Sequence, residues 1–213
     1  MTGDFVPYGG FRLCRNIGRG GSGLKALPGS VFTAADFLDL GSRASIDQAL
    51  SRNARAGAIQ KLARGVYHYP RRHPQLGVLA PSTDDVARAL AGRDASRLQP
   101  SGAHAANLLG LSDQVPVRAV YLTDGRARTV PIGKRTVVLK KTTPRNMATA
   151  GRISGTVIQA LRWLGRRSVD DRVIQALRKR LTEDDRKQLL ADIRLAPAWI
   201  GGIMRRVAGA ERL

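Results

Sequence analysis

Apolar and polar positions become regular from Val31 onward. They predict a short helix over 34–40, capped by Thr33 and followed by a glycine, with its large apolar side chains facing inward. A second helix is predicted from Arg43 to about Ala56, because its apolar residues recur every three or four positions. Two helices joined by so tight a turn indicate a helix-turn-helix.

Two short apolar runs follow the second helix. They cover 59–62 and 66–69 and flank a glycine-containing turn at 63–65, a pattern typical of a β-hairpin. Short helix, turn, longer helix and basic hairpin is the order of a winged helix-turn-helix. The basic, proline-bounded stretch 70–74 is predicted to be a linker that ends this domain.

The fold class predicted for the whole chain is α+β. A poorly defined segment (1–30) precedes the winged helix-turn-helix (31–74), and an α+β domain that ends in several helices follows (75–213). In that second domain, helices are predicted over 82–91, 101–110, 154–164, 169–181, 183–195 and 198–208, and strands over 117–123, 129–132 and 136–141.

The second helix of the helix-turn-helix has two different faces. At about 100° per residue, Ile46, Ala49, Leu50 and Asn53 share the side that packs on the domain. The opposite arc holds residue types that pair with base edges, such as Gln with adenine and Arg with guanine. We therefore predict DNA contacts from Ala44, Asp47, Gln48, Ser51, Arg52 and Arg55 on this arc, Ser42 and Arg43 at the helix N-terminus, and Lys61 and Arg64 on the hairpin.

Asn53 stands where an apolar core residue is expected. An unpaired buried amide costs ~1–3 kcal/mol. Asn53 must therefore find a backbone partner, or it weakens the domain.

Net charge favours a polyanionic partner. The chain has 36 Lys and Arg against 16 Asp and Glu, a net charge of +20. Residues 1–75 carry 11 basic and 4 acidic side chains, 76–150 carry 11 and 5, and 151–213 carry 14 and 7, so the charge is not confined to a tail. Nucleic acid is the usual partner of such a chain and an anionic membrane surface is the other, although solvated arginine faces in a basic proteome would give the same count.

Compartment signals indicate the cytoplasm. The chain has one cysteine, Cys14, so it forms no internal disulfide, which suits a reducing environment. Its longest apolar runs are far shorter than the ~18 residues of a membrane span, and no secretory signal is visible.

Catalytic and cofactor motifs are weak. The G-x-G-x-x-G string at 18–23 lacks the flanking strand and helix that a nucleotide site needs. His68, His73 and His104 are too scattered to form a metal site with Cys14, and His68 is interpreted as a surface residue and His104 as a residue near the core. We expect no cofactor, no metal and no enzymatic activity. Trp163 and Trp199 lie in amphipathic helices and are interpreted as core residues.

Two stretches resemble one known family. VFTAADFLDLGSRASIDQALSRNARAGAIQKLARGVYHYPR (31–71) resembles the N-terminal winged helix of AbiEi-type antitoxins, and RLQPSGAHAANLLGLSDQVPVRAVYLTDG (97–125) resembles the start of their C-terminal domain. This resemblance implies a bacterial toxin–antitoxin operon, repression of its own promoter, and neutralisation of a nucleotidyltransferase-like toxin, with antitoxicity residing in the C-terminal domain.

The predicted partner is thus a double-stranded promoter operator, with two copies on inverted repeats because one short helix reads only a few base pairs. A protein-interaction module with only non-specific DNA binding is the alternative. An RNA-binding role is disfavoured by the 5% aromatic content, since readers of single-stranded RNA stack bases on exposed rings.

Overall fold

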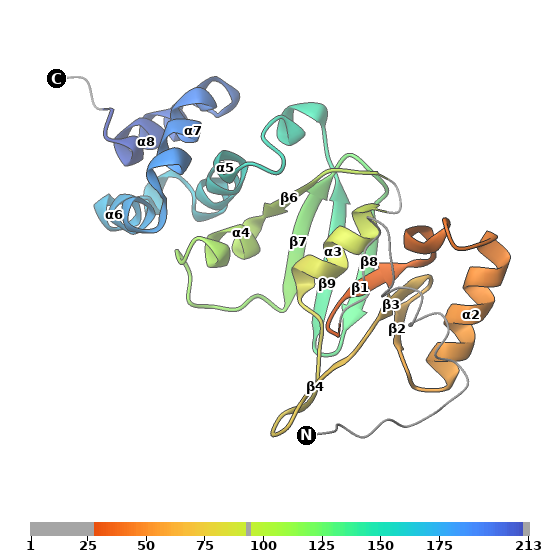
Figure 1. Cartoon of the computed structure of the whole chain (residues 1–213). Coiled ribbons are helices and arrows are strands. Elements are labelled where there is room, and N and C mark those ends of the chain that lie inside the picture. Colours follow the sequence, from red (N-terminus) through yellow and green to blue (C-terminus); the bar gives the residue numbers. More distant parts are fainter. Residues whose placement is uncertain (1–27, 93–94, 211–213) are drawn as a thin grey trace. The chain divides into compact units, whose positions relative to one another are not determined.

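The chain folds into two compact units. The computed structural model describes residues 28–92 and 95–210. Unit 1 comprises 1–93 together with 131–133, and unit 2 comprises 94–130 and 134–213 (Figure 1). Both helices and sheets are present, so the predicted α+β class is confirmed. The predicted segment 1–30, with its glycine-rich string, lies outside the described residues except for its last three positions.

Unit 1 contains a winged-helix arrangement. A three-stranded antiparallel sheet has the order β1-β3-β2, so β3 is its central strand. The predicted hairpin is present as β2 and β3, whereas β1 was not predicted, since three residues are too few for a periodic signal. In chain order the elements are β1 (Val31–Thr33), the 3₁₀ helix η1 (Ala34–Phe37), α2 (Arg43–Arg55), β2 (Gln60–Ala63) and β3 (Val66–His68).

The helix cap predicted at Thr33 is formed. The Thr33 hydroxyl accepts a hydrogen bond from the Ala35 N–H at 3.3 Å, and the Asp36 carboxylate accepts from the Thr33 N–H at 2.6 Å. This capping box starts η1, which ends at Phe37 instead of reaching residue 40. The prediction that all its apolar side chains face inward is wrong, because Leu38 and Leu40 lie beyond the helix and are 51% and 46% exposed.

The core of unit 1 holds α2 against the sheet. Its buried members include Phe32, Phe37, Leu50 and Tyr67, with the Phe32 ring 5.3 Å from Phe37 and 6.3 Å from Tyr67 between centroids. Burial of a leucine such as Leu50, which is 1% exposed, contributes about 1.5–3 kcal/mol. The packing of these side chains determines which face of α2 is exposed to solvent.

Asn53 is accommodated by the backbone of its own helix. Its side chain is 7% exposed, and its Nδ2 donates to the carbonyl oxygen of Ala49 at 2.8 Å. Its own carbonyl oxygen accepts from the N–H of Ala58 at 3.0 Å as the chain turns toward β2. Asn53 therefore has the backbone partner that burial requires.

The predicted linker 70–74 is instead part of a second hairpin. Strands β4 (Arg71–His73) and β5 (Gly77–Leu79) pair antiparallel. The imidazole Nδ1 of His73 accepts hydrogen bonds from two N–H groups of the turn, those of Gln75 at 3.2 Å and Leu76 at 3.3 Å. The linker prediction was wrong because proline and glycine here form a turn inside a hairpin, with Gly77 at a φ of +71°.

Helix α3 (Thr83–Gly92) completes unit 1. It starts at the predicted Ser82, whose hydroxyl accepts from the Asp85 N–H at 3.0 Å. The helix packs on β1 and β3 through apolar residues that include Val86 and Leu90. Unit 1 therefore extends beyond the predicted domain end at residue 74.

Unit 2 begins with a mixed sheet of order β6-β7-β9-β8 (Figure 1). β6 pairs antiparallel with β7, and β7 pairs parallel with β9. The predicted strands β7 to β9 and the predicted helix α4 are confirmed, whereas β6, which contains Pro100, was not predicted. The elements are β6 (Leu98–Ser101), α4 (Gly102–Leu108), β7 (Arg118–Thr123), β8 (Arg128–Ile132), whose last two residues are counted with unit 1, and β9 (Arg135–Lys141).

Helices form the rest of unit 2, as predicted. A shared core buries one face of α5, α6, α7 and α8, with Leu161, Leu177, Leu189 and Met204 fully enclosed. Trp163 was expected in this core but is 47% exposed. The elements are η2 (Pro144–Met147), α5 (Ile153–Leu164), η3 (Arg166–Ser168), α6 (Asp171–Arg180), α7 (Glu183–Ala191), η4 (Ile193–Leu195) and α8 (Ala198–Ala208).

Candidate nucleic-acid interface

Helix α2 presents the polar face that its sequence predicts. Its buried residues are Ile46, Ala49, Leu50 and Asn53, so the predicted buried side is confirmed. On the opposite side Ser51 is half-buried, and the other predicted contact residues of the helix and its N-terminus are exposed: Ser42, Arg43, Ala44, Asp47, Gln48, Arg52 and Arg55. One amphipathic helix thus places one set of side chains in the core and the other in solvent.

Two of the predicted contact residues pair with each other. The Arg43 Nε lies 3.0 Å from the Asp47 Oδ2, one helical turn away, and both side chains are about half exposed. An exposed pair of this kind contributes about 0–1 kcal/mol, so a phosphate can displace the carboxylate at little cost.

Ser42 caps α2. Its hydroxyl oxygen accepts from the Ser45 N–H at 3.3 Å, and the Ser45 hydroxyl donates to the Ser42 carbonyl at 2.8 Å. The role established for Ser42 is thus structural, and it positions the first turn of the helix, where N–H groups and the helix dipole favour an anion.

The later part of α2 carries the available donors. Within the described chain, the side chains of Gln48, Arg52 and Arg55 form no hydrogen bond or ion pair with other residues. Cations in the last turn of a helix also stabilise its dipole by about 0.3–1 kcal/mol, which is a structural use for Arg52 and Arg55. That use leaves the guanidinium groups in solvent, able to donate to another molecule.

The β2–β3 hairpin supplies further cations beside α2. Arg64 lies at the turn, where Gly65 has a φ of +73°, and Lys61 pairs in register with Tyr67. Both basic side chains are exposed. A hairpin turn of this kind requires a residue that tolerates positive φ, which explains the glycine.

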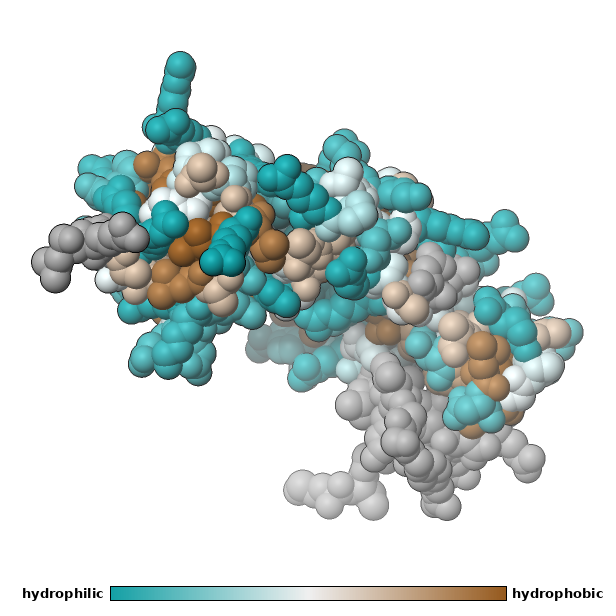
Figure 2. All heavy atoms as spheres, turned by 90° about the horizontal axis from the view of Figure 1, so that it is seen from above, coloured by the Kyte–Doolittle hydropathy of each residue, from teal (hydrophilic) through white to brown (hydrophobic). Residues whose placement is uncertain are grey.

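Acidic residues are absent from a long stretch that includes both hairpins. Between Asp47 and Asp84 the sequence has no Asp or Glu, and all its Lys and Arg side chains are exposed. Figure 2 shows hydrophilic residues over most of the visible face, with hydrophobic residues gathered in patches between them. The basic residues of this acid-free stretch are Arg52, Arg55, Lys61, Arg64, Arg71 and Arg72.

His68 does not belong to this surface, contrary to the prediction. It is 1% exposed, because β3 is the central strand and all three of its residues are buried. Burial lowers the pKa of the His68 imidazole, against an opposing effect of the Asp85 carboxylate. The neighbouring Tyr67 hydroxyl has a raised pKa, chiefly through burial and secondly through Asp47. Both groups are therefore neutral parts of the core at neutral pH.

Several polar groups of unit 2 bind one another. Arg97 Nε contacts the Asp124 Oδ2 at 2.8 Å, and these hydrogen bonds hold the pKa of the Asp124 carboxyl below its usual range. Arg206 pairs with Asp171. His104, predicted to lie near the core, is buried with its Nε2 2.8 Å from the Tyr121 hydroxyl.

Residues 28–92 and 95–210, which the structure describes, lack two further features. No cluster of His, Cys, Asp and Glu there could hold a metal ion. No helix there combines the length and the apolar character that crossing a membrane requires.

The prediction of contact residues missed two exposed arginines. Arg71 and Arg72 lie on strand β4, and both are exposed. Interpreting 70–74 as a linker hid them, although Pro74 and Gly77 before a short apolar run could have signalled a hairpin.

Unit 1 therefore has the predicted order of short helix, longer helix and hairpin, and its outer face is basic. Residues 23–189 match DUF6088, a family of unknown function, and the chain belongs to that family. No curated protein matches the chain. A solved structure of the RV2827C protein from Mycobacterium tuberculosis is similar at 15% sequence identity, covers 83% of this chain and 76% of that chain, and has a TM-score of 0.42.

Proposed function

We propose that this protein binds double-stranded DNA sequence-specifically, represses its own promoter in the bacterial cytoplasm, and is the antitoxin to a nucleotidyltransferase-like toxin. The observation that carries the DNA-binding part is the outer face of α2. Gln48, Arg52 and Arg55 extend into solvent there, while Leu50 holds the opposite face in the core.

The chemistry of this face suits a major groove. An α-helix fits the groove, where Gln pairs with adenine and Arg with guanine through two hydrogen bonds each. Lys61 on the β2–β3 hairpin is exposed beside the helix and suits the phosphate backbone. One helix reads few base pairs, so two copies on an inverted repeat are expected.

The antitoxin part rests on the resemblance of 31–71 and 97–125 to AbiEi-type antitoxins. Unit 2 is the part expected to neutralise the toxin. Co-expression with a nucleotidyltransferase encoded beside it tests this. Rescue of growth supports the antitoxin role, and continued toxicity at equal expression contradicts it.

The DNA-binding part is tested with Arg52→Ala. In a gel-shift series on the chain's own upstream duplex and its single-base variants, loss of one base contact should cost ~1–3 kcal/mol and relax the preference at one position. Arg180→Ala, at an exposed arginine of α6, is the matched control and should bind as the unaltered protein does. Equal losses in the two variants, or no change at any base pair, would contradict the assignment of α2.

A protein-interaction module with only non-specific DNA binding is the second candidate. It is favoured by apolar side chains exposed on unit 2, among them Val117 at 64% and Trp163 at 47%. This candidate predicts the same affinity for every duplex and loss of binding at moderate salt.

A further inference from the structure

Hairpin β4–β5 is the most exposed element of unit 1. Every residue from 71 to 78 is exposed, including Leu76 at 72% and Val78 at 43%. Figure 1 shows the hairpin as an arm that extends away from the β1-β3-β2 sheet. A two-stranded hairpin by itself is marginally stable in water, and apolar side chains at its tip are characteristic of a contact surface.

The arm starts beside the C-terminal end of α2. Gln60, which opens β2 shortly after α2, pairs with His68, the last residue of β3. The chain then leaves β3 through two residues and begins β4 at Arg71. The base of the arm and the end of α2 that carries Arg55 therefore lie at the same end of the sheet.

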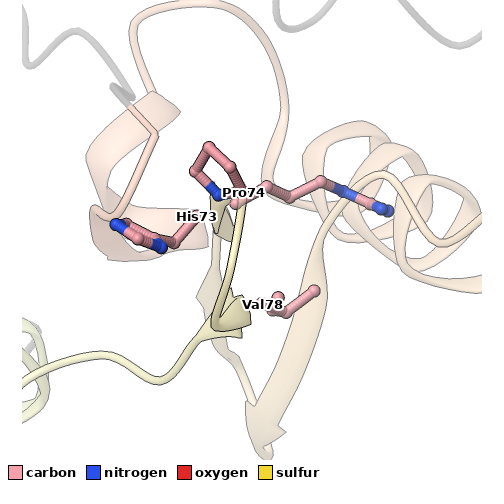
Figure 3. Close-up of a pocket in the computed structure, with 5 residues that line it drawn as sticks. His73, Pro74 and Val78 are labelled. Carbon is pink, nitrogen blue, oxygen red and sulfur yellow. The ribbon is translucent and has the colours of Figure 1, made fainter.

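Both faces of the arm are basic. In the register of the hairpin Arg71 is opposite Leu79 and Arg72 is opposite Val78, so the two arginines point to different faces. Figure 3 shows the same alternation, with His73 and Val78 on opposite sides. A hollow of about 440 Å³ is lined by Arg72, His73, Pro74, Gly77 and Val78.

We propose that hairpin β4–β5 is a second DNA-contacting arm, in which Arg71 and Arg72 bind backbone phosphates and Leu76 packs in the minor groove. This inference rests on the proposed DNA binding by α2. Its ground is charge complementarity, because the arm belongs to the acid-free stretch and its guanidinium groups have no partner within the described chain. Proteins that hold the minor groove combine arginine with apolar wedges such as leucine.

Salt titration of DNA binding by the full chain tests the arginines. The slope of log K against log [salt] becomes about 0.9 less negative for each lost phosphate contact, so Arg71→Gln/Arg72→Gln should make it about 1.8 less negative. Arg166→Gln/Arg167→Gln, an adjacent exposed pair on η3, is the matched control and should keep the slope. A similar change of slope in both double variants would show a general effect of charge and would contradict the proposal that the arm contacts DNA.

Leu76→Ser tests the apolar tip separately. It should weaken binding roughly tenfold at every salt concentration without changing the slope, because it removes buried apolar area and no charge. Failure of the unaltered protein to bind duplex DNA would refute the proposed function itself. If the unaltered protein binds DNA and both arm variants retain its affinity and slope, only the proposal for the arm is refuted. A change in oligomeric state with unchanged DNA binding would assign the arm to a second copy of the chain and refute our proposal.

Discussion

The two units differ in what their positive charges contact. Residues 1–93 with 131–133 hold 13 Lys and Arg against 6 Asp and Glu, and the rest of the chain holds 23 against 10. Unit 2 is thus the more basic one, yet Arg97, Arg152 and Arg206 are bound by carboxylates of the same unit. On the acid-free stretch of unit 1, Arg52 and Arg55 have no such partner within the described chain. Net charge alone therefore does not locate an interface.

The contrast extends to buried polar groups. In unit 2 the Asp192 carboxylate is 5% exposed, accepts from Arg152 at 2.7 Å and also accepts from the buried Ser154 hydroxyl. Such groups link the start of α5 to the end of α7. In unit 1, by comparison, the buried face of α2 is apolar except for Asn53, and its polar groups point to solvent. Substitutions in the two units should therefore separate stability from DNA binding.

The largest loss of stability is expected from substitutions in the hydrophobic cores of the two units. Leu50→Ala in unit 1 and Leu177→Ala in unit 2 each remove a fully buried leucine and should cost about 2–5 kcal/mol of unfolding free energy. Only Leu50→Ala should abolish DNA binding, because only this substitution loosens the packing that holds α2 against the sheet. Urea unfolding and gel shifts measure the two outcomes, and equal loss of DNA binding in both variants would break the contrast.

A smaller loss is expected from Asp192→Ala. It leaves the Ser154 hydroxyl, which is fully buried, without its acceptor, and should cost ~1–3 kcal/mol. Thermal unfolding measures the loss, and DNA affinity should not change. Asp184→Ala, at an exposed carboxylate of α7, is the control and should leave the melting temperature in place.

Acid should destabilise unit 1 through His68. Burial lowers the pKa of its imidazole in the folded state, so below the ordinary value of 6.5 the unfolded chain takes up a proton more readily. The stability contributed by the neutral ring is present above pH 6.5 and is lost as the pH falls below it. Urea midpoints of the protein and of His68→Gln test this, since the variant should show a flatter pH dependence.

The smallest effect is expected at the exposed pair on α2. Asp47→Ala should change the unfolding free energy by only about 0–1 kcal/mol. It should at the same time strengthen binding to any duplex at low salt, because it frees the Arg43 guanidinium and removes a negative charge from the outer face. A loss of affinity that depends on the identity of a single base pair would instead show that Asp47 contacts a base.

Local patterns were sufficient to predict α2 and its surroundings. The helical period of Ile46 and Leu50, the cap at Ser42 and the glycine of the β2–β3 turn are all signals within a few residues of the element they define. The division of α2 into a buried and an exposed face followed from the same period. The outer face of α2 was therefore predictable, apart from the Arg43–Asp47 pair.

The structural features that the sequence did not predict depend on pairing between strands that are distant in the sequence. β1 is short and forms through pairing of Val31 with His68, and β6 forms through pairing of Leu98 with Thr123. Burial of His68 follows from the central place of β3, which no local pattern encodes. Strand formation of this kind depends on cross-strand neighbours more than on intrinsic preference.

The central claim, that the outer face of α2 lies against duplex DNA, is tested most directly by photocrosslinking. A photoreactive residue replaces Gln48 on α2 or, as a matched control, Gln175 on α6, since both are exposed glutamines on helices. With the duplex from upstream of its own coding sequence, we expect crosslinks to bases from position 48 and few from position 175. Equal yields from the two positions, or none from position 48 while DNA is bound, would contradict the claim.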